Sequence, residues 1–247
     1  MKSKQEHKES PNCNHGKRIV LSSSNKGGVG KSFFNIQYVE WLREHPEKPT
    51  FRAFDPDDAN KTLLSYHSEV TQFIDVDRSQ SLDACLTVLS DEVAVSVVDG
   101  LGSQQKKTML AWAKEISLFE VCRDNGIQIT FVQIIEDDRD VILQCRSLLE
   151  EIGDAVDWLF VLNQKQGKDF MMWKDSETRK LAYALGGIEM VLPKVPDHIA
   201  VWCSSNRQSL VQAQSDKRPH LLDQQRFRTY WRLIKEEMDQ VSKVLLP

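Results

Sequence analysis

Two kinds of hydrophobic pattern alternate along this chain of 247 residues. Short, continuous apolar runs bounded by polar residues are typical of strands that are buried on both faces of a sheet. They predict strands at residues 18–22, 50–54, 93–98, 127–135, 158–162 and 188–192. In longer segments apolar residues recur every three or four positions, which is typical of helices with one buried face. They predict helices at residues 32–44, 104–124, 138–152, 175–185 and 221–246.

The order of these segments predicts the fold class. Strands that alternate with helices of this length need crossover connections, so we expect an α/β fold with a mostly parallel, doubly wound sheet and helices on both faces. In such sheets ligands bind at the carboxyl ends of the strands. Residues 1–17 show neither pattern and are expected to form a flexible polar tail, and residues 18–247 a single domain with a C-terminal helix.

Composition excludes several classes of protein. Hydrophobic residues make up 40% of the chain and its formal net charge is -4, which excludes disorder throughout. The apolar runs are shorter than the roughly 20 residues of a membrane span, and the first 17 residues are too polar for a signal peptide. The balance of 32 basic and 36 acidic residues does not indicate nucleic-acid binding, although it does not exclude a local basic patch.

Cysteine usage indicates the compartment. The five cysteines are odd in number and widely spaced, which excludes a disulfide framework and a zinc site. We therefore expect buried or incidental thiols in a reducing environment, and a cytoplasmic protein.

A glycine-rich segment lies between the first predicted strand and the helix that follows. Residues 23–32 are Ser-Ser-Asn-Lys-Gly-Gly-Val-Gly-Lys-Ser, and this pattern between a strand and a helix is typical of a nucleotide-phosphate loop. Glycines let the backbone N–H groups converge on phosphate oxygens at the start of the helix. Lys31 would supply positive charge to the β- and γ-phosphates, and the Ser32 hydroxyl would bind magnesium.

The third predicted strand is followed directly by an acidic residue. The apolar run Val93–Val98 precedes Asp99, a pattern typical of a Walker B aspartate. We expect Asp99 to hold magnesium through water and Gly102 to let the backbone approach the γ-phosphate.

Lys26 to Ser32, Lys-Gly-Gly-Val-Gly-Lys-Ser, resembles the deviant Walker A motif of the ParA/MinD group of P-loop ATPases. The resemblance implies ATP and Mg²⁺ as cofactors and hydrolysis to ADP and phosphate. It also implies a homodimer that encloses ATP, in which Lys26 reaches the partner's phosphates. The nucleotide-binding residues that it implies in this loop are Gly27, Gly28, Val29, Gly30, Lys31, Ser32 and Phe33.

The same resemblance assigns roles outside the loop. It implies that Asp55 positions the attacking water and contacts the magnesium shell, so that Lys26, Lys31 and Asp55 are catalytic and Ser32, Asp55 and Asp99 serve the metal. It also implies that Asn163 contacts the adenine edge and that Pro193 lines the base pocket. The chain departs from the family at Ala53, where the family often has a first aspartate. It also departs after the Walker B strand, where the family frequently has Asp-x-Pro-Pro and this chain has Asp-Gly-Leu-Gly, with Gly100 and Gly102.

The resemblance leaves the cargo open. ParA-like proteins bind nonspecific DNA through surface Lys and Arg, and the candidates here are Lys217, Arg218, Arg226, Arg228, Arg232 and Lys235. MinD-like proteins bind membrane through a C-terminal amphipathic helix. The acidic residues Glu236, Glu237 and Asp239 oppose anionic lipid, so membrane binding is not expected, and Trp231, Ile234 and Met238 are expected to pack on the domain.

We therefore expect a slowly hydrolysing ParA-like ATPase that positions or segregates plasmid DNA, with nonspecific DNA and a small adaptor or DNA-binding protein as partners. DNA binding would place it at the nucleoid. A second possibility is an accessory ATPase of conjugative transfer, since the segment Leu-Asn-Gln-Lys-Gln-Gly at 162–167 looks similar to TraL-like ATPases of conjugative plasmids. The positioning of a different cargo, including a membrane-linked one, and a nucleotide-dependent scaffold without useful turnover also stay open.

Overall fold

The computed structural model describes residues 16–24, 26–58, 60–90 and 92–247, and most of the predicted tail lies outside them. Its centre is a seven-stranded sheet of order β3-β2-β4-β1-β5-β6-β7, and every pair of neighbouring strands is parallel. The strands are β1 (Lys17–Ser23), β2 (Phe51–Asp55), β3 (Thr71–Phe73), β4 (Val95–Leu101), β5 (Ile127–Ile135), β6 (Asp157–Asn163) and β7 (Ile188–Leu192). The predicted α/β fold with a parallel sheet is confirmed.

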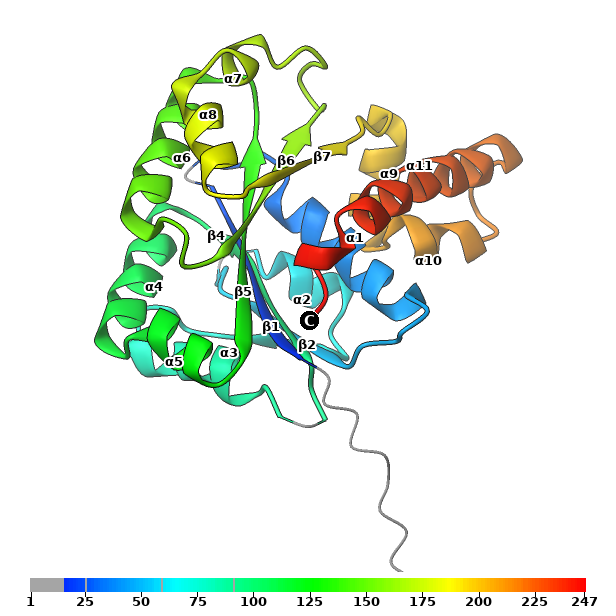
Figure 1. The fold of residues 1–247 in the computed structure, drawn as a ribbon. Helices are drawn as coiled ribbons and strands as arrows, with labels where there is room; N and C mark the ends of the chain where they lie inside the picture. The colour runs from blue at the N-terminus through cyan, green and yellow to red at the C-terminus, as the bar shows by residue number, and fades with distance from the viewer. Residues whose placement is uncertain (1–15, 25, 59, 91) are drawn as a thin grey trace, which may run out of the picture.

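Helices cover both faces of the sheet (Figure 1). Each face has its own hydrophobic core. One layer consists of α1 (Lys31–Glu44), α2 (Thr62–Tyr66), α9 (Asp197–Asn206), α10 (Leu210–Ser215) and α11 (Leu221–Gln240). The other consists of η1 (Ser79–Leu82), α3 (Asp83–Thr87), α4 (Ser103–Glu115), α5 (Leu118–Asp124), α6 (Arg139–Ile152), α7 (Met171–Lys174) and α8 (Glu177–Ala184). None of the helices in the described ranges combines the length and the hydropathy that a bilayer span requires.

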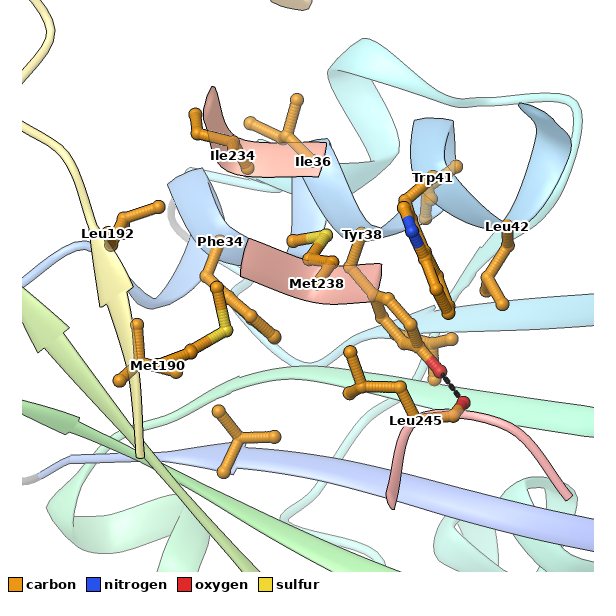
Figure 2. Packing of buried hydrophobic residues seen from close by; sticks show 14 of the residues in the cluster. Phe34, Ile36, Tyr38, Trp41, Leu42, Met190, Leu192, Ile234, Met238 and Leu245 are labelled. Carbon is orange, nitrogen blue, oxygen red and sulfur yellow. Dashed lines mark hydrogen bonds between the residues drawn. The ribbon is translucent and has the colours of Figure 1, made fainter. Parts of the chain in front are cut away.

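The C-terminal helix belongs to the core. Helix α11 buries Trp231, Ile234 and Met238, as the sequence predicted. Figure 2 shows Ile234 and Met238 beside side chains of α1, and the Tyr38 hydroxyl donates to the backbone oxygen of Leu245 at 2.5 Å. Because α1 packs against β1, β4, α2 and α11, its residues 34–42 are all buried. The predicted end of the helix at residue 246 is wrong, since α11 ends at Gln240 and a short 3-10 helix, η2 (Ser242–Val244), follows.

A buried arginine fixes the last residues to the sheet. Arg18 of β1 is only 1% exposed. Its guanidinium donates to the backbone oxygens of Leu246 at 2.7 Å and Lys243 at 3.2 Å. It also donates to the side chains of Thr130, Asp157 and Gln128, each at 2.6 Å. These contacts join the start of β1, β5 and β6 to the C-terminal segment.

Two further sequence predictions need correction. The segment 104–124 forms two helices, α4 and α5, because Ser117 adopts a left-handed conformation with φ 50° that turns Leu118 and Cys122 into the core. Strand β4 extends through Leu101, because its pairing with β1 continues to Ser23. Asp99 therefore lies inside the strand and not after it.

Four of the five cysteines lie in the described residues, and all four are buried free thiols: Cys85, Cys122, Cys145 and Cys203. The expectation of buried thiols is confirmed for these four, and Cys13 lies outside the described residues. Burial is the main cause that raises the pKa of each thiol. All four therefore stay protonated at neutral pH and act as small apolar side chains.

Candidate nucleotide site

The phosphate loop lies between β1 and α1, in the middle of the sheet. Lys31 begins α1, and its Nζ donates to the backbone oxygens of Ser24 at 3.1 Å and Lys26 at 3.2 Å. Burial lowers the pKa of the Lys31 ammonium, while Asp99 and Asp57 act in the opposite direction. Backbone dipoles thus hold this cation over the loop, where a phosphate would complete its pairing.

The end of β6 is tied to the same loop. The Asn163 Nδ2 donates to the backbone oxygen of Val29 at 2.6 Å, and its Oδ1 accepts from the Lys165 N–H at 3.1 Å. Lys165 Nζ in turn donates to the backbone oxygen of Gly28 at 3.0 Å. Gly30 has φ 102°, and a Cβ there would lie 2.6 Å from the Asn163 Nδ2. Only glycine therefore permits this approach, and the Asn163 amide holds the loop in place. Its predicted contact with the adenine edge stays a prediction.

Two buried carboxylates stand next to the loop. Asp99 is 2% exposed, and burial, followed by the nearby charge of Asp55, raises its pKa to about 7. Hydrogen bonds from Asn35 and Ser32 and the charge of Lys31 oppose that rise. Asp55 is fully buried and accepts from the N–H groups of Asp57 and Leu64, both at 3.0 Å. Burial also raises the pKa of Asp55. A cation between the two acids would relieve both the desolvation and the repulsion.

These residues fit magnesium with a phosphate chain. The donors are carboxylate and hydroxyl oxygens, which are the ligands that Mg²⁺ prefers. In the described ranges no group of three or more His, Cys, Asp or Glu side chains could hold a metal alone. Phosphate oxygens and water would therefore supply the other ligands. Gly100, with φ 44°, brings the backbone of β4 close to the loop, since a Cβ there would lie 3.5 Å from the Ser32 Oγ.

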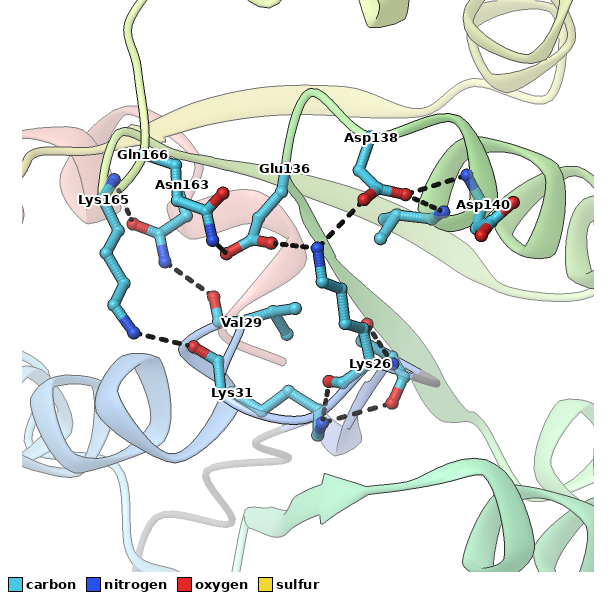
Figure 3. A network of polar contacts seen from close by, with 12 residues as sticks. Lys26, Val29, Lys31, Glu136, Asp138, Asp140, Asn163, Lys165 and Gln166 are labelled. Carbon is cyan, nitrogen blue, oxygen red and sulfur yellow. Dashed lines mark hydrogen bonds and ion pairs between the residues drawn. The ribbon is translucent and has the colours of Figure 1, made fainter.

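Lys26 is paired within its own chain. Its Nζ lies 3.2 Å from Glu136 Oε2 and 3.0 Å from Asp138 Oδ2, as Figure 3 shows. Gln166 Nε2 donates to Glu136 Oε1 at 3.3 Å. The hydrogen bond with Asp138 is the main cause that raises the pKa of Lys26 and lowers that of Asp138. For Lys26 to contact a partner's phosphates, as predicted, it must leave these acids.

Sequence reasoning missed Glu136 and Asp138. Both follow β5, the neighbour of β1, so the sheet order brings them to the loop. The signal was present, because three acidic residues in succession, 136–138, come directly after a predicted buried strand. Asp138 also caps α6 by accepting from the N–H groups of Asp140 and Val141.

Two further predicted binding residues lie at the start of α1 and directly after β7. Phe33 is half-buried and packs against the core beneath α1. Pro193 follows β7, which β5 and β6 separate from β1. Their predicted contacts with a nucleotide stay predictions.

Most of the predicted DNA-binding side chains are paired with acids of the same chain. The pairs are Arg218–Asp216 at 2.6 Å, Arg226–Asp223 at 2.5 Å, Arg232–Glu236 at 3.4 Å and Lys235–Glu44 at 3.3 Å. Such pairing reduces the positive potential that phosphates would meet along this surface.

Comparisons with known proteins agree with this architecture. No protein-family model matches the chain. Protein MobD of Acidithiobacillus ferrooxidans is 24% identical over 201 residues, which cover 78% of this chain and 85% of MobD. Among solved structures, a chain of the MinC:MinD cell division protein complex of Aquifex aeolicus superposes with a TM-score of 0.53. That match is 11% identical and covers 93% of this chain and 97% of the other.

Proposed function

We propose that this chain, which has the MinD/ParA-like P-loop fold and is a distant homologue of MobD, is an ATPase that binds ATP with Mg²⁺. One observation carries the proposal: Lys31, Ser32, Asp55 and Asp99 converge at the carboxyl ends of the strands. Their buried charge is not fully paired by the protein's own side chains. A structural cluster of this kind would be costly without a ligand.

Each residue has a distinct task in this proposal. The loop N–H groups and Lys31 hold the phosphates, and Ser32 and Asp99 hold the metal, which neutralises charge on the phosphates when bound. Asp55 orients the attacking water, because its carboxylate is fixed by two backbone N–H groups. The Asn163 amide retains hydrogen-bonding capacity for the adenine edge after binding the loop.

We propose further that ATP joins two copies and that turnover is slow. Lys26 is the residue that supports this, since a flexible cation at the edge of the loop can reach an added phosphate from a second chain. In the single chain it is held by Glu136 and Asp138 instead. If Lys26 exchanged these two acids for the phosphate of a second chain's nucleotide, dimerisation would depend on nucleotide binding.

Phosphate release and light scattering test this function together. With ATP and Mg²⁺ we expect slow release of phosphate and a doubling of mass. Asp55→Asn should abolish release and keep the ATP-dependent dimer. Dimerisation without any phosphate release in the unmodified chain would show a scaffold. The absence of both dimerisation and phosphate release would refute the proposal.

We propose plasmid DNA as the cargo, with a small adaptor protein. DNA co-sedimentation that requires ATP and weakens with salt would support this role. Arg228→Glu should reduce binding more than Arg218→Glu, because Arg218 is already paired with Asp216. DNA binding of equal strength with and without ATP would contradict this role.

A second candidate is an accessory ATPase of conjugative transfer. The sequence similarity to MobD favours it, and so does the pairing of the basic side chains on α11. Loss of plasmid transfer with normal plasmid retention in a cell that lacks this chain would establish it over partition. The reverse phenotype would establish partition.

A further inference from the structure

Asn35 is a buried polar residue inside an otherwise apolar stretch of α1. It lies between Phe34 and Ile36, three residues after Ser32, and is fully buried. Its Nδ2 donates to Asp99 Oδ1 at 2.5 Å and to Ser22 Oγ at 2.6 Å. One amide group therefore joins α1 to β4 and β1.

The same contacts reach the backbone beyond the Walker B aspartate. Ser22 Oγ accepts from the Gly100 N–H at 3.0 Å as well as from Asn35. Asn35 thus holds the side chain of Asp99 directly and the backbone of Gly100 through Ser22. Both belong to the part of β4 that faces the phosphate loop.

Packing alone does not account for an amide at this position. Its Oδ1 has no hydrogen-bond partner in the structure, and a buried unpaired polar atom costs stability. A leucine side chain has the same number and branching of heavy atoms and contains no polar atom that would be left unpaired. The two hydrogen bonds that Nδ2 donates must therefore offset the cost of the unpaired oxygen.

We propose that Asn35 is a positioning residue for the magnesium site. It fixes one oxygen of Asp99 against β1 and so sets how the carboxylate faces Ser32 and the loop. This inference rests on the proposed nucleotide function, and it adds a residue that the phosphate-loop and strand-end motifs do not contain. A merely structural role for Asn35 would lower stability and affect nucleotide binding equally with and without metal.

The experiment measures the affinity of the full chain for a fluorescent ATP analogue, once in EDTA and once with Mg²⁺. The dissociation constant in EDTA divided by the dissociation constant with Mg²⁺ reports the contribution of the metal. Asn35→Leu should lower this ratio about tenfold or more, the range for a hydrogen bond to a charged group, with affinity in EDTA unchanged. Gln37→Leu is the matched control, since Gln37 is a buried amide on the same helix that also has an unpartnered oxygen.

Three results would decide against the inference or its premise. An unchanged ratio in Asn35→Leu, which an equal loss of affinity in EDTA and Mg²⁺ would also give, overturns the positioning role. The same fall in Gln37→Leu also overturns it, because any loss of a buried amide would then suffice. No binding by the unmodified chain under either condition overturns the proposed function itself. If Asn35→Leu does not fold, Asn35→Ser and Ser22→Ala replace it, with a smaller fall of the ratio expected for each.

Discussion

The two ends of the sheet both contain buried charge, but they hold it in different ways. At the amino ends of the strands, Arg18 donates to a carboxylate, two side-chain oxygens and two backbone oxygens of its own chain. At the carboxyl ends, Lys31 donates to backbone oxygens only, and Asp55 and Asp99 repel each other in a buried site. At the first end the protein's own groups pair the charge, whereas at the second end a cation and an anion would be required to pair it.

This difference separates structural charge from functional charge. A buried ion is tolerated when every hydrogen-bonding position is used, as it is around Arg18. A site whose charges shift each other's pKa values and remain partly unpaired is a candidate for binding and catalysis. The two ends should therefore respond in opposite ways to substitution.

The largest effect is expected for Lys31→Met. Hydrolysis should fall about 10²–10³-fold, because a charge that stabilises the phosphates is lost. The free energy of unfolding should stay the same or rise, since a half-buried cation with a lowered pKa is removed. Phosphate release and urea unfolding measure the two effects, and a strongly destabilised variant would contradict the comparison.

Arg18→Met should have the reverse profile. The free energy of unfolding should fall by about 3 kcal/mol, because Asp157 and two backbone oxygens lose their donor. Nucleotide affinity of the folded protein should be unchanged, since Arg18 is at the opposite end of the sheet. Urea unfolding and nucleotide titration below the unfolding transition check both parts. A loss of affinity without a loss of stability would show that the two ends are not independent.

His67 offers a test within the α1 layer, where a buried group is held neutral. Its Nε2 lies 3.1 Å from the backbone oxygen of Ile36 and its Nδ1 3.3 Å from Arg43 Nη1. Burial, followed by the charge of Arg43, lowers the pKa of His67 to about 4. Because the unfolded chain binds a proton near pH 6.5 and the folded chain does not, stability is lost as pH falls from about 6.5 towards 4.

The expected loss from His67 between pH 7 and pH 4.5 is about 2 kcal/mol. It is measured as the difference between the unmodified chain and His67→Gln in urea unfolding, so that the nearby Glu40, whose pKa burial raises, contributes equally to both. Parallel pH profiles of the two proteins would show that His67 is not held neutral.

The smallest effect concerns Lys26. In Asp138→Asn its pKa should fall back towards the ordinary value, because the hydrogen bond with Asp138 is the main cause that raises it. Asparagine keeps the capping of α6, so the fold should not change. An NMR titration of the lysine side chains measures the shift. The same pKa in both proteins would mean that Lys26 is not held by this acid in solution.

The long elements and the phosphate loop could be predicted because their signals are local. Strand β5 is a continuous apolar run, and residues 26–32 contain the whole loop motif. Short elements such as β3 and α7 carry too few residues for a period to appear. The break at Ser117 depends on a left-handed residue that the helical pattern of 104–124 does not reveal.

The rest of the site depends on contacts between distant segments. Asn35 reaches Asp99, and Lys26 reaches Asp138, only after the sheet order is known. Arg18 lies in a predicted strand, but its partners come from β5, β6 and the C-terminal segment. Such contacts leave no spacing rule in a single sequence.

One titration tests the central claim most directly. A calorimetric titration of the full chain with a non-hydrolysable ATP analogue and Mg²⁺ should show one nucleotide bound per chain. Binding should be weaker in EDTA and lost in Lys31→Met, while Arg18→Met, studied below its unfolding transition, should bind like the unmodified protein. Equal loss of binding in both variants, or no heat of binding in the unmodified chain, would contradict the claim that the carboxyl end of the sheet holds charge for a ligand.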